Sequence, residues 1–267
     1  SACPAGGRRY KATNNNSPIP QRRIYYNYHY FDNAFAASVR ANPAEGIDVQ
    51  RHEFGFEYSF WCNLASIQLE VPFSNTIDSS LDFSGARPAL RDTEFGNVAV
   101  ALKGVLYQDC YKTISVGVGV DLPTADDVVV TYGTGTIEFE NETIAISPYL
   151  GAVFDDGATS TTAEIEDATL LHVDGSIGYW IRRDCCGGGL AAILELHYTA
   201  NLSGEEVLLG PATQSVTRID ADFLYATAGA TWVNGCWSVT PAIVLPLLDE
   251  PDRFSDWEAL VQVNRRF

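Results

Sequence analysis

Regular alternation of side-chain character along short segments is the feature that most constrains the fold of this chain. The clearest example is Ile114–Leu122, in which even-numbered positions are Ile, Val or Leu and odd-numbered positions are Ser, Gly or Asp. Successive side chains of a β-strand point to opposite faces, so this segment has one apolar face and one small or polar face. The pattern predicts a strand that separates two different surroundings.

The composition narrows what those surroundings are. Only 19% of the 267 residues are charged, and no window of 18 residues is continuously apolar. A helical membrane span is therefore excluded, whereas a transmembrane β-barrel is compatible, because its apolar residues occupy every second position. The chain contains no Met, so Ser1 is not an initiator residue; a removed export signal or a trimmed chain would each explain this.

Twelve segments carry strand-like character, and they follow an irregular leader of residues 1–21, which is expected to lie in the periplasm, outside the barrel wall. Segment 158–166 is the weakest because it is poor in apolar residues. The predicted strands are about 22–31, 52–61, 65–73, 95–107, 114–122, 144–154, 158–166, 171–182, 194–199, 219–226, 237–245 and 257–267. Residues 22–267 are thus expected to form one domain.

The connections between these segments alternate in length. Short turns fall at Cys62-Asn63, Asp109-Cys110 and Asn234-Gly235, whereas 74–93 and 123–142 are long connections. Membrane barrels place short turns on the periplasmic side and long loops outside, and a soluble sandwich, the alternative, needs no such rule. The sequence predicts an all-β transmembrane antiparallel up-and-down barrel of about twelve strands, with ten or fourteen as alternatives.

Several runs of the chain resemble one bacterial family. They include HEFGFEYSF, ASIQLEVPF, ISVGVGVDLPTADD and VTPAIVLPL, followed by a final strand that ends in Phe267. They resemble the outer-membrane family named for the meta-pathway of phenol degradation, over most of residues 24–267. The resemblance implies an outer-membrane location after export and a connection with uptake of small, often apolar molecules. The resemblance lies in the predicted wall strands, and it does not include the six cysteines.

The polar face of the predicted strands supplies the candidate lumen. Acidic groups outnumber basic ones there, in a chain of net charge −17, so a water-filled lumen would favour cations or neutral solutes. We expect a porin-like passive channel; the alternative is a closed structural or surface-interaction barrel whose charged groups pair and fill the lumen. The predicted lining residues are Arg23, Glu53, Glu57, Glu70, Lys103, Asp121, Asp174, Arg182, Glu195, His197, Asp220, Asp222, Glu258 and Arg266.

Four aromatic residues stand at strand ends next to the short turns. By the same alternation, Trp61, Tyr107, Trp180 and Trp232 point inward and are predicted to narrow the periplasmic mouth. The alternative is an aromatic girdle at the membrane interface, formed if the alternation slips at the strand ends.

The cysteines gather at the same end of the predicted barrel. Disulfides that tie the turns to one another or to the leader are the expected use, since no CxxC pair occurs. Six cysteines allow 15 pairings, and a metal or haem site is the alternative. The candidates are Cys3, Cys62, Cys110, Cys185, Cys186 and Cys236.

Catalysis is not expected. The four histidines, His29, His52, His172 and His197, are not accompanied by a GxSxG motif, and their Ser, Thr or acidic neighbours follow from sharing one polar face. No cofactor or metal is predicted. The expected partners are outer-membrane lipid, small solutes, and envelope proteins or further copies of the chain; the acidic balance argues against nucleic acid.

Overall fold

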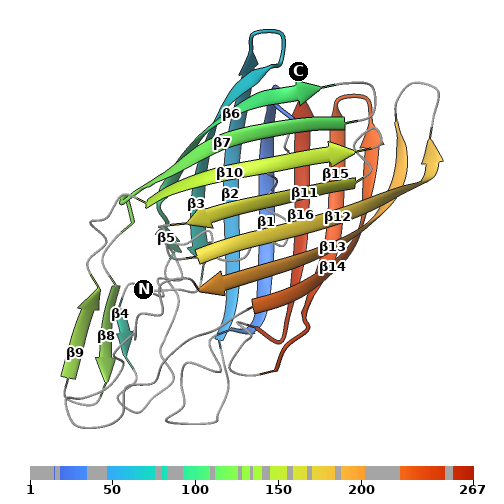
Figure 1. Ribbon diagram of the computed structural model, residues 1–267. Coiled ribbons are helices and arrows are strands. Elements are labelled where there is room, and N and C mark those ends of the chain that lie inside the picture. Colours follow the sequence, from blue (N-terminus) through green and yellow to red (C-terminus); the bar gives the residue numbers. More distant parts are fainter. Residues whose placement is uncertain are drawn as a thin grey trace.

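Twelve long antiparallel strands form the wall of a barrel in the computed structural model (Figure 1). The structure describes residues 15, 19–34, 47–75, 80–82, 93–108, 112–125, 128–132, 135–139, 145–154, 159–166, 170–183, 188–201, 223–249 and 255–267. Among these, no helix has the length and apolar character needed to cross a membrane.

The wall strands follow the predicted order along the chain. They are β1 (Arg23–Ala34), β2 (Ile47–Phe60), β3 (Ala65–Asn75), β6 (Val98–Gln108), β7 (Lys112–Leu122), β10 (Ala145–Phe154), β11 (Thr159–Glu166), β12 (Leu170–Arg183), β13 (Gly189–Asn201), β14 (Phe223–Asn234), β15 (Trp237–Pro246) and β16 (Trp257–Arg266). The weakest predicted segment, 158–166, is confirmed as wall strand β11, which pairs with both β10 and β12.

Each wall strand pairs with two neighbours, and the first and last strands pair with each other. β1 runs antiparallel to β16 from Arg23↔Arg266 to Asp32↔Trp257, and β2 pairs with both β1 and β3. The order of strands therefore returns to its starting point. The twelve-strand barrel predicted from the alternation is confirmed. Every wall strand is hydrogen-bonded to a neighbouring strand on both of its sides, so the wall has no free edge strand.

The connections confirm the predicted alternation of length with one exception. The barrel end that carries the C-terminus, which we call the short-turn end, has connections 61–64, 109–111, 155–158, 184–188 and 235–236. The opposite, long-connection end has 35–46, 76–97, 123–144, 202–222 and 247–256. The exception is 167–169 at this second end, which links β11 to β12 in three residues.

Four short strands lie in two of the long connections and were not predicted. They are β4 (Ser80–Asp82), β5 (Thr93–Phe95), β8 (Val128–Tyr132) and β9 (Gly135–Phe139). β5 pairs with the end of β3, while β4, β8 and β9 form a separate sheet in which β4 and β8 are parallel. Strands of three to five residues are too short for alternation to distinguish them from loops.

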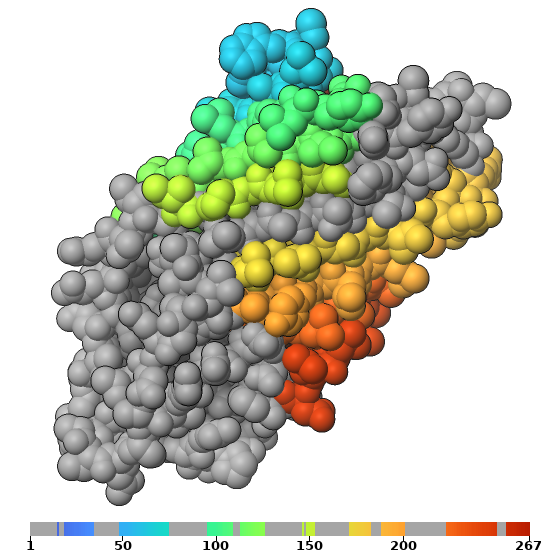
Figure 2. Space-filling model, viewed as in Figure 1, coloured from blue at the N-terminus to red at the C-terminus, as the bar shows by residue number. Residues whose placement is uncertain are grey.

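The wall has two chemically different faces. Large apolar side chains lie exposed at alternate outer positions, with Ile177 59% exposed, Leu194 59% and Ile243 53%. Figure 2 shows the outer faces of β6, β7 and β10 side by side, and those of β12, β13 and β14 side by side. The inner positions carry polar or small side chains that are largely buried, such as Glu57, Ser66 and Ser115. Apolar outside and polar inside is the arrangement expected in a lipid bilayer.

The alternation of β14 is opposite to the prediction. Because Asp220 and Asp222 were predicted to face the lumen, alternation placed Phe223 and Tyr225 toward lipid. Tyr225 is instead 7% exposed and packs on the inner side against Val244 and Leu260. The strand runs from Phe223 to Asn234 rather than over 219–226, and Leu224, Ala226 and Ala228 pair with outer-face positions of its neighbours. Because Ala226 and Ala228 lie on the outer face and Tyr225 on the inner face, the alternation of apolar residues in this strand did not show which face meets lipid.

A glycine lets one side chain cross its neighbouring strand inside the barrel. Tyr25 of β1 is paired with Gly55 of β2, and its ring lies directly over that glycine. A Cβ at position 55 would fall 1.8 Å from the ring carbon Cζ. Because the ring passes over β2, the Tyr25 hydroxyl reaches β3, where it donates to Glu70 Oε2 at 2.7 Å and accepts from Gln68 Nε2.

Replacing Gly55 should therefore destabilise the barrel. We expect Gly55→Ala to lower the free energy of unfolding by about 1–3 kcal/mol, because the methyl group must displace the Tyr25 ring and its hydrogen bonds. Urea titration of the protein folded in lipid vesicles, followed by tryptophan fluorescence, measures the change. Gly104→Ala is the matched control, since a Cβ there meets nothing within 4 Å. Equal stability of the two variants would contradict this account of Tyr25.

Candidate functional site: the lumen of the barrel

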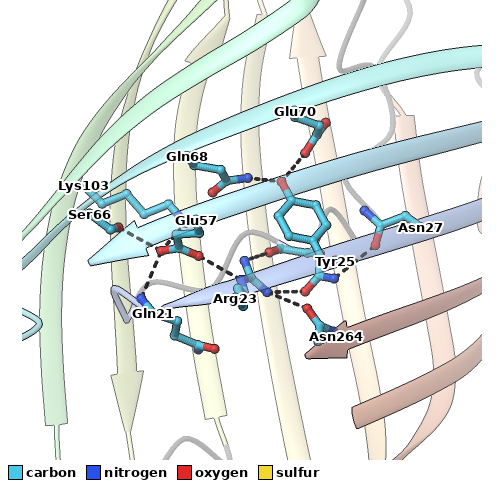
Figure 3. A network of polar contacts seen from close by, with 11 residues as sticks. Gln21, Arg23, Tyr25, Asn27, Glu57, Ser66, Gln68, Glu70, Lys103 and Asn264 are labelled. Atoms are coloured by element: carbon cyan, nitrogen blue, oxygen red, sulfur yellow. Dashed lines mark hydrogen bonds and ion pairs between the residues drawn. The ribbon is translucent and has the colours of Figure 1, made fainter. Parts of the chain in front are cut away.

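A buried carboxylate organises the lumen side of β1, β2, β3 and β6. Glu57 is fully buried, and its Oε2 accepts from Arg23 Nε at 2.8 Å. Its Oε1 accepts from Ser66 Oγ at 2.8 Å and lies 3.6 Å from Lys103 Nζ. Two cations thus flank one anion, and a hydroxyl adds a further hydrogen bond to it (Figure 3). Buried charges are tolerated when they are paired and hydrogen-bonded in this way.

Arg23 extends this centre to the leader and to the last strand. Its guanidinium donates to Asn264 Oδ1 of β16 at 3.0 Å, and also to the side-chain and main-chain oxygens of Asn15. Asn15 in turn donates to Asn27 Oδ1 at 3.1 Å, and the Gln21 main-chain nitrogen donates to Glu57 Oε1 at 3.2 Å. Residues of the leader therefore lie inside the barrel, in contact with wall side chains (Figure 3).

A second carboxylate centre lies farther from the short-turn end. Glu53 accepts from Arg51 Nε at 2.8 Å and from Asn27 Nδ2 at 2.9 Å. His29 lies between two carboxylates, with Nδ1 2.6 Å from Glu258 Oε1 and Nε2 3.7 Å from Glu53 Oε2. Asn27 joins the two centres, because it contacts both Asn15 and Glu53. The polar contacts thus run continuously across β16, β1, β2, β3 and β6.

The inner face of β12 and β13 carries a separate set of acidic and imidazole groups. His197 Nδ1 lies 2.7 Å from Asp174 Oδ1, and its Nε2 lies 3.2 Å from Glu195 Oε2. These two carboxylates are more accessible than Glu53 and Glu57 of β2: the side chains of Asp174 and Glu195 are 17% and 19% exposed, against 1% for Glu53 and 0% for Glu57. This wall is therefore the part of the described lumen where acidic groups are most open to solvent.

Comparison with known proteins gives structural likeness only. Similar solved structures include LpxR from Salmonella typhimurium, with a TM-score of 0.47, 10% identity and coverage of 92% of this chain and 100% of that one. Another is OmpF from Salmonella typhi in complex with daunomycin, with a TM-score of 0.40, 11% identity and coverage of 93% and 98%. No family model and no curated protein matches the chain.

The membrane assignment rests on the surface of the chain itself. Apolar side chains at outer positions are exposed on strands around the ring, from Ile24 and Phe54 through Leu102 and Ile177 to Leu245. A water-soluble protein rarely exposes so extended an apolar surface. The chain is a transmembrane β-barrel of the outer-membrane type.

Most of the predicted lining residues lie at inner positions of this outer-membrane barrel. Arg23, Glu53, Glu57, Glu70, Lys103, Asp121, His197 and Glu258 are buried there, Asp174 and Glu195 are partly exposed, and Arg266 pairs with Arg23 at the short-turn end. Asp220 and Asp222 lie outside the described residues.

The prediction for Arg182 was wrong. The ladder between β12 and β13 shifts register between Trp180 and Arg182, so Arg182 pairs with outer-face Leu190 and is exposed. A bulge inserts one residue into the strand and reverses every later side chain. The prediction that Tyr107 points inward was wrong for the same reason. Tyr107 follows a register shift after Val105 and pairs with outer-face Ile114.

Three of the four aromatic residues predicted to narrow the periplasmic mouth do not face the lumen. Trp61 lies in the turn after β2 and is 74% exposed, and Trp232 pairs with outer-face Leu190 and Val239 because the alternation of β14 is reversed. Of the four candidates, Trp180 alone pairs with an inner position, Ala191. The other three fit the alternative interpretation, an aromatic girdle near the short-turn end.

The predicted disulfides are not seen where the structure allows a test. Cys62 and Cys236 are exposed free thiols in two short turns. Cys3, Cys110, Cys185 and Cys186 lie outside the described residues, so their pairing stays a prediction. Among the described residues, no cluster of three or more His, Cys, Asp or Glu could hold a metal ion.

Two central members of the network were not predicted. Tyr25 has the same inward parity as Arg23 and Asn27, but an aromatic residue on a polar face was not recognised as part of the lumen. Asn15 lies in a leader without periodicity, so no pattern could place it. The inward parity of Tyr25 opposite Gly55 was the one signal that could have found it.

Removing the central carboxylate should be costly because Arg23 and Lys103 both lose the anion that they flank. We expect Glu57→Gln to lower the free energy of unfolding by about 3–5 kcal/mol. Adding Lys103→Met should recover part of the loss, since the uncompensated charge under the wall is then smaller. Asp249→Asn, at an exposed position, is the control. Urea unfolding in vesicles measures all three variants, and a Glu57→Gln protein as stable as the control would contradict the central position of Glu57.

Proposed function

We propose that the protein is a non-enzymatic, porin-like channel of the outer membrane that passes small cationic or neutral solutes by diffusion. The observation that carries the proposal is the charge of the inner face. The charged residues described at inner positions include seven carboxylates and four Lys or Arg side chains. The acids are Glu53, Glu57, Glu70, Asp121, Asp174, Glu195 and Glu258, and the bases are Arg23, Arg51, Lys103 and Arg266. Such a lining attracts cations and repels anions.

The wall of β12 and β13 is the part that we propose to contact the solute. Asp174 and Glu195 keep part of their surface exposed, whereas Glu53 and Glu57 of β2 are sealed by their own partners. Elsewhere a small inner residue does not leave open space, since the ring of Tyr149 from β10 lies over Gly117 of β7. The path of the solute would therefore follow β12 and β13.

The resemblance of the strand sequences to the family named for the meta-pathway of phenol degradation supports a finer proposal. The solutes would be small molecules, and the protein would be exported with removal of a signal peptide and inserted with its short turns in the periplasm. Outer-membrane lipid would surround the barrel, and envelope proteins or further copies of the chain are proposed partners at its ends or wall.

A closed structural barrel is the second candidate, and one observation favours it. Arg23, Glu57 and Lys103 are each at most 3% exposed, so the network under β1, β2 and β6 admits no water path of its own. A lumen packed in this way over its whole section would support interactions of the outer loops without transport.

Ion selectivity in planar bilayers tests the channel. We expect single-channel currents carried mainly by cations, and we expect Asp174→Asn with Glu195→Gln to lower the cation-over-anion permeability ratio about twofold or more, because the accessible negative charge is removed. Reversal potentials in a salt gradient give the ratio, and Asp249→Asn is the control at an exposed position outside the strands. Channels with unchanged selectivity would contradict the role of this wall, and absence of channels in every variant would favour the closed barrel.

A further inference from the structure

Two arginines lie on the outer face of the barrel at the short-turn end, where β1 meets β16. Arg265 pairs with Ile24 in the closing ladder, and the next outer residue of β16, Phe267, donates its main-chain nitrogen to the Arg22 carbonyl oxygen at 3.1 Å. Arg22 and Arg265 are therefore diagonal neighbours on adjacent strands, within reach of each other for long side chains. Both side chains are exposed, and we call them the arginine pair.

Each guanidinium of the arginine pair rests on an aromatic ring. Arg22 Cζ lies 4.9 Å from the centre of the Tyr58 ring, and Arg265 Cζ lies 5.5 Å from the centre of the Trp237 ring. Arg22 is held further, because its Nε donates to the Ser59 carbonyl oxygen at 3.1 Å. A guanidinium has five N–H donors, and no described residue accepts from the Nη nitrogens of either arginine. The pair is thus held in place by the wall and keeps donors for an acceptor from outside.

The residues around the arginine pair indicate its depth in the membrane. Tyr58 and Trp237 are exposed on the outer face, and Tyr and Trp side chains in that position lie at the level of the lipid headgroups. One outer step toward the middle of the barrel, the exposed residues become apolar, with Ile24 on β1 and Phe56 on β2. The two guanidinium groups therefore lie at the level of the lipid phosphates, directly beside a surface that faces acyl chains.

The charge of this outer patch is opposite in sign to that of the chain. The charged groups described there are Arg22, Arg265 and the terminal carboxylate of Phe267, so a net positive charge remains, whereas the whole chain carries −17. At the long-connection end, the exposed charged residues among those described are acidic, namely Asp48 and Asp249. An anion in the membrane surface is therefore attracted to the arginine pair and repelled from the opposite end.

We propose that the arginine pair binds the phosphodiester of an anionic phospholipid, with a glycerol headgroup as in phosphatidylglycerol. Guanidinium groups match phosphate oxygens in geometry, and donors that the wall already holds lose little freedom on binding. A zwitterionic lipid carries an ammonium group close to its phosphate, which two guanidinium groups disfavour. The acyl chains lie along Ile24 and Phe56. This lipid site is outside the lumen, so it stands whether or not the barrel conducts.

Photocrosslinking in vesicles tests the site in the full-length chain. The protein is folded in phosphatidylcholine vesicles that contain a trace of phosphatidylglycerol with a diazirine near the start of one acyl chain, and mass spectrometry locates the label after illumination. Diazirine phosphatidylcholine with identical chains measures non-specific contact. Arg265→Gln removes one member of the pair, and Arg22→Gln with Arg265→Gln removes both. Arg182→Gln is the matched control, because Arg182 is an exposed arginine at the same end of the barrel but on β12.

We expect phosphatidylglycerol to label the outer residues of β1 and β16 beside the pair about fivefold or more above phosphatidylcholine. Arg265→Gln should lower this labelling about fivefold and the double variant about tenfold or more, while Arg182→Gln leaves it unchanged. Equal labelling by the two lipids in the native chain would overturn the site without recourse to any variant. Equal effects of Arg265→Gln and Arg182→Gln would overturn it too, because the attraction would then belong to the whole rim.

Discussion

The pairing of β1 with β16 is the interaction on which the rest of the structure depends. A backbone amide or carbonyl facing hydrocarbon has no water to bond, so strands can span a bilayer only when every edge is paired. Here residues more than 220 positions apart in sequence, such as Arg23 and Arg266, form the closing ladder. Closure turns one alternating pattern into two surfaces, an apolar exterior and a polar interior. It also brings Asn264 and Glu258 beside Arg23 and His29, which no local feature could do.

The interior then has to neutralise the charges that closure brings together. Glu57 and Glu53 each receive a cation and further hydrogen-bond donors, and Gly55 allows Tyr25 to link three strands across the inner face. These contacts hold one side of the lumen as a packed layer, while the β12 and β13 wall keeps partly exposed acids. Asn15 and Gln21 join the packed side, so the network that stabilises the wall also holds these two residues inside the barrel.

Strand positions were predictable because their two faces meet lipid and polar lumen, and that contrast repeats every second residue. The faces of Ile114–Leu122 and of the final strand follow directly. Errors arose where the period breaks: bulges reversed Tyr107 and Arg182, and alanines on the outside of β14 hid the inward position of Tyr225. The partners within the network were beyond prediction, because contacts such as Arg23 with Asn264 depend on closure and those of Asn15 come from a segment with no pattern.

The most direct test of the closed, two-faced barrel is a spin-label scan of β15 from Ser238 to Leu245 in lipid vesicles, one position at a time. The account predicts that labels at Val239, Ile243 and Leu245 are broadened by oxygen dissolved in lipid, whereas labels at Ser238, Thr240 and Val244 are shielded from it. Accessibility would then alternate with a period of two residues. Uniform shielding of all positions from lipid oxygen, as in a strand buried between two stacked sheets, would contradict the membrane barrel.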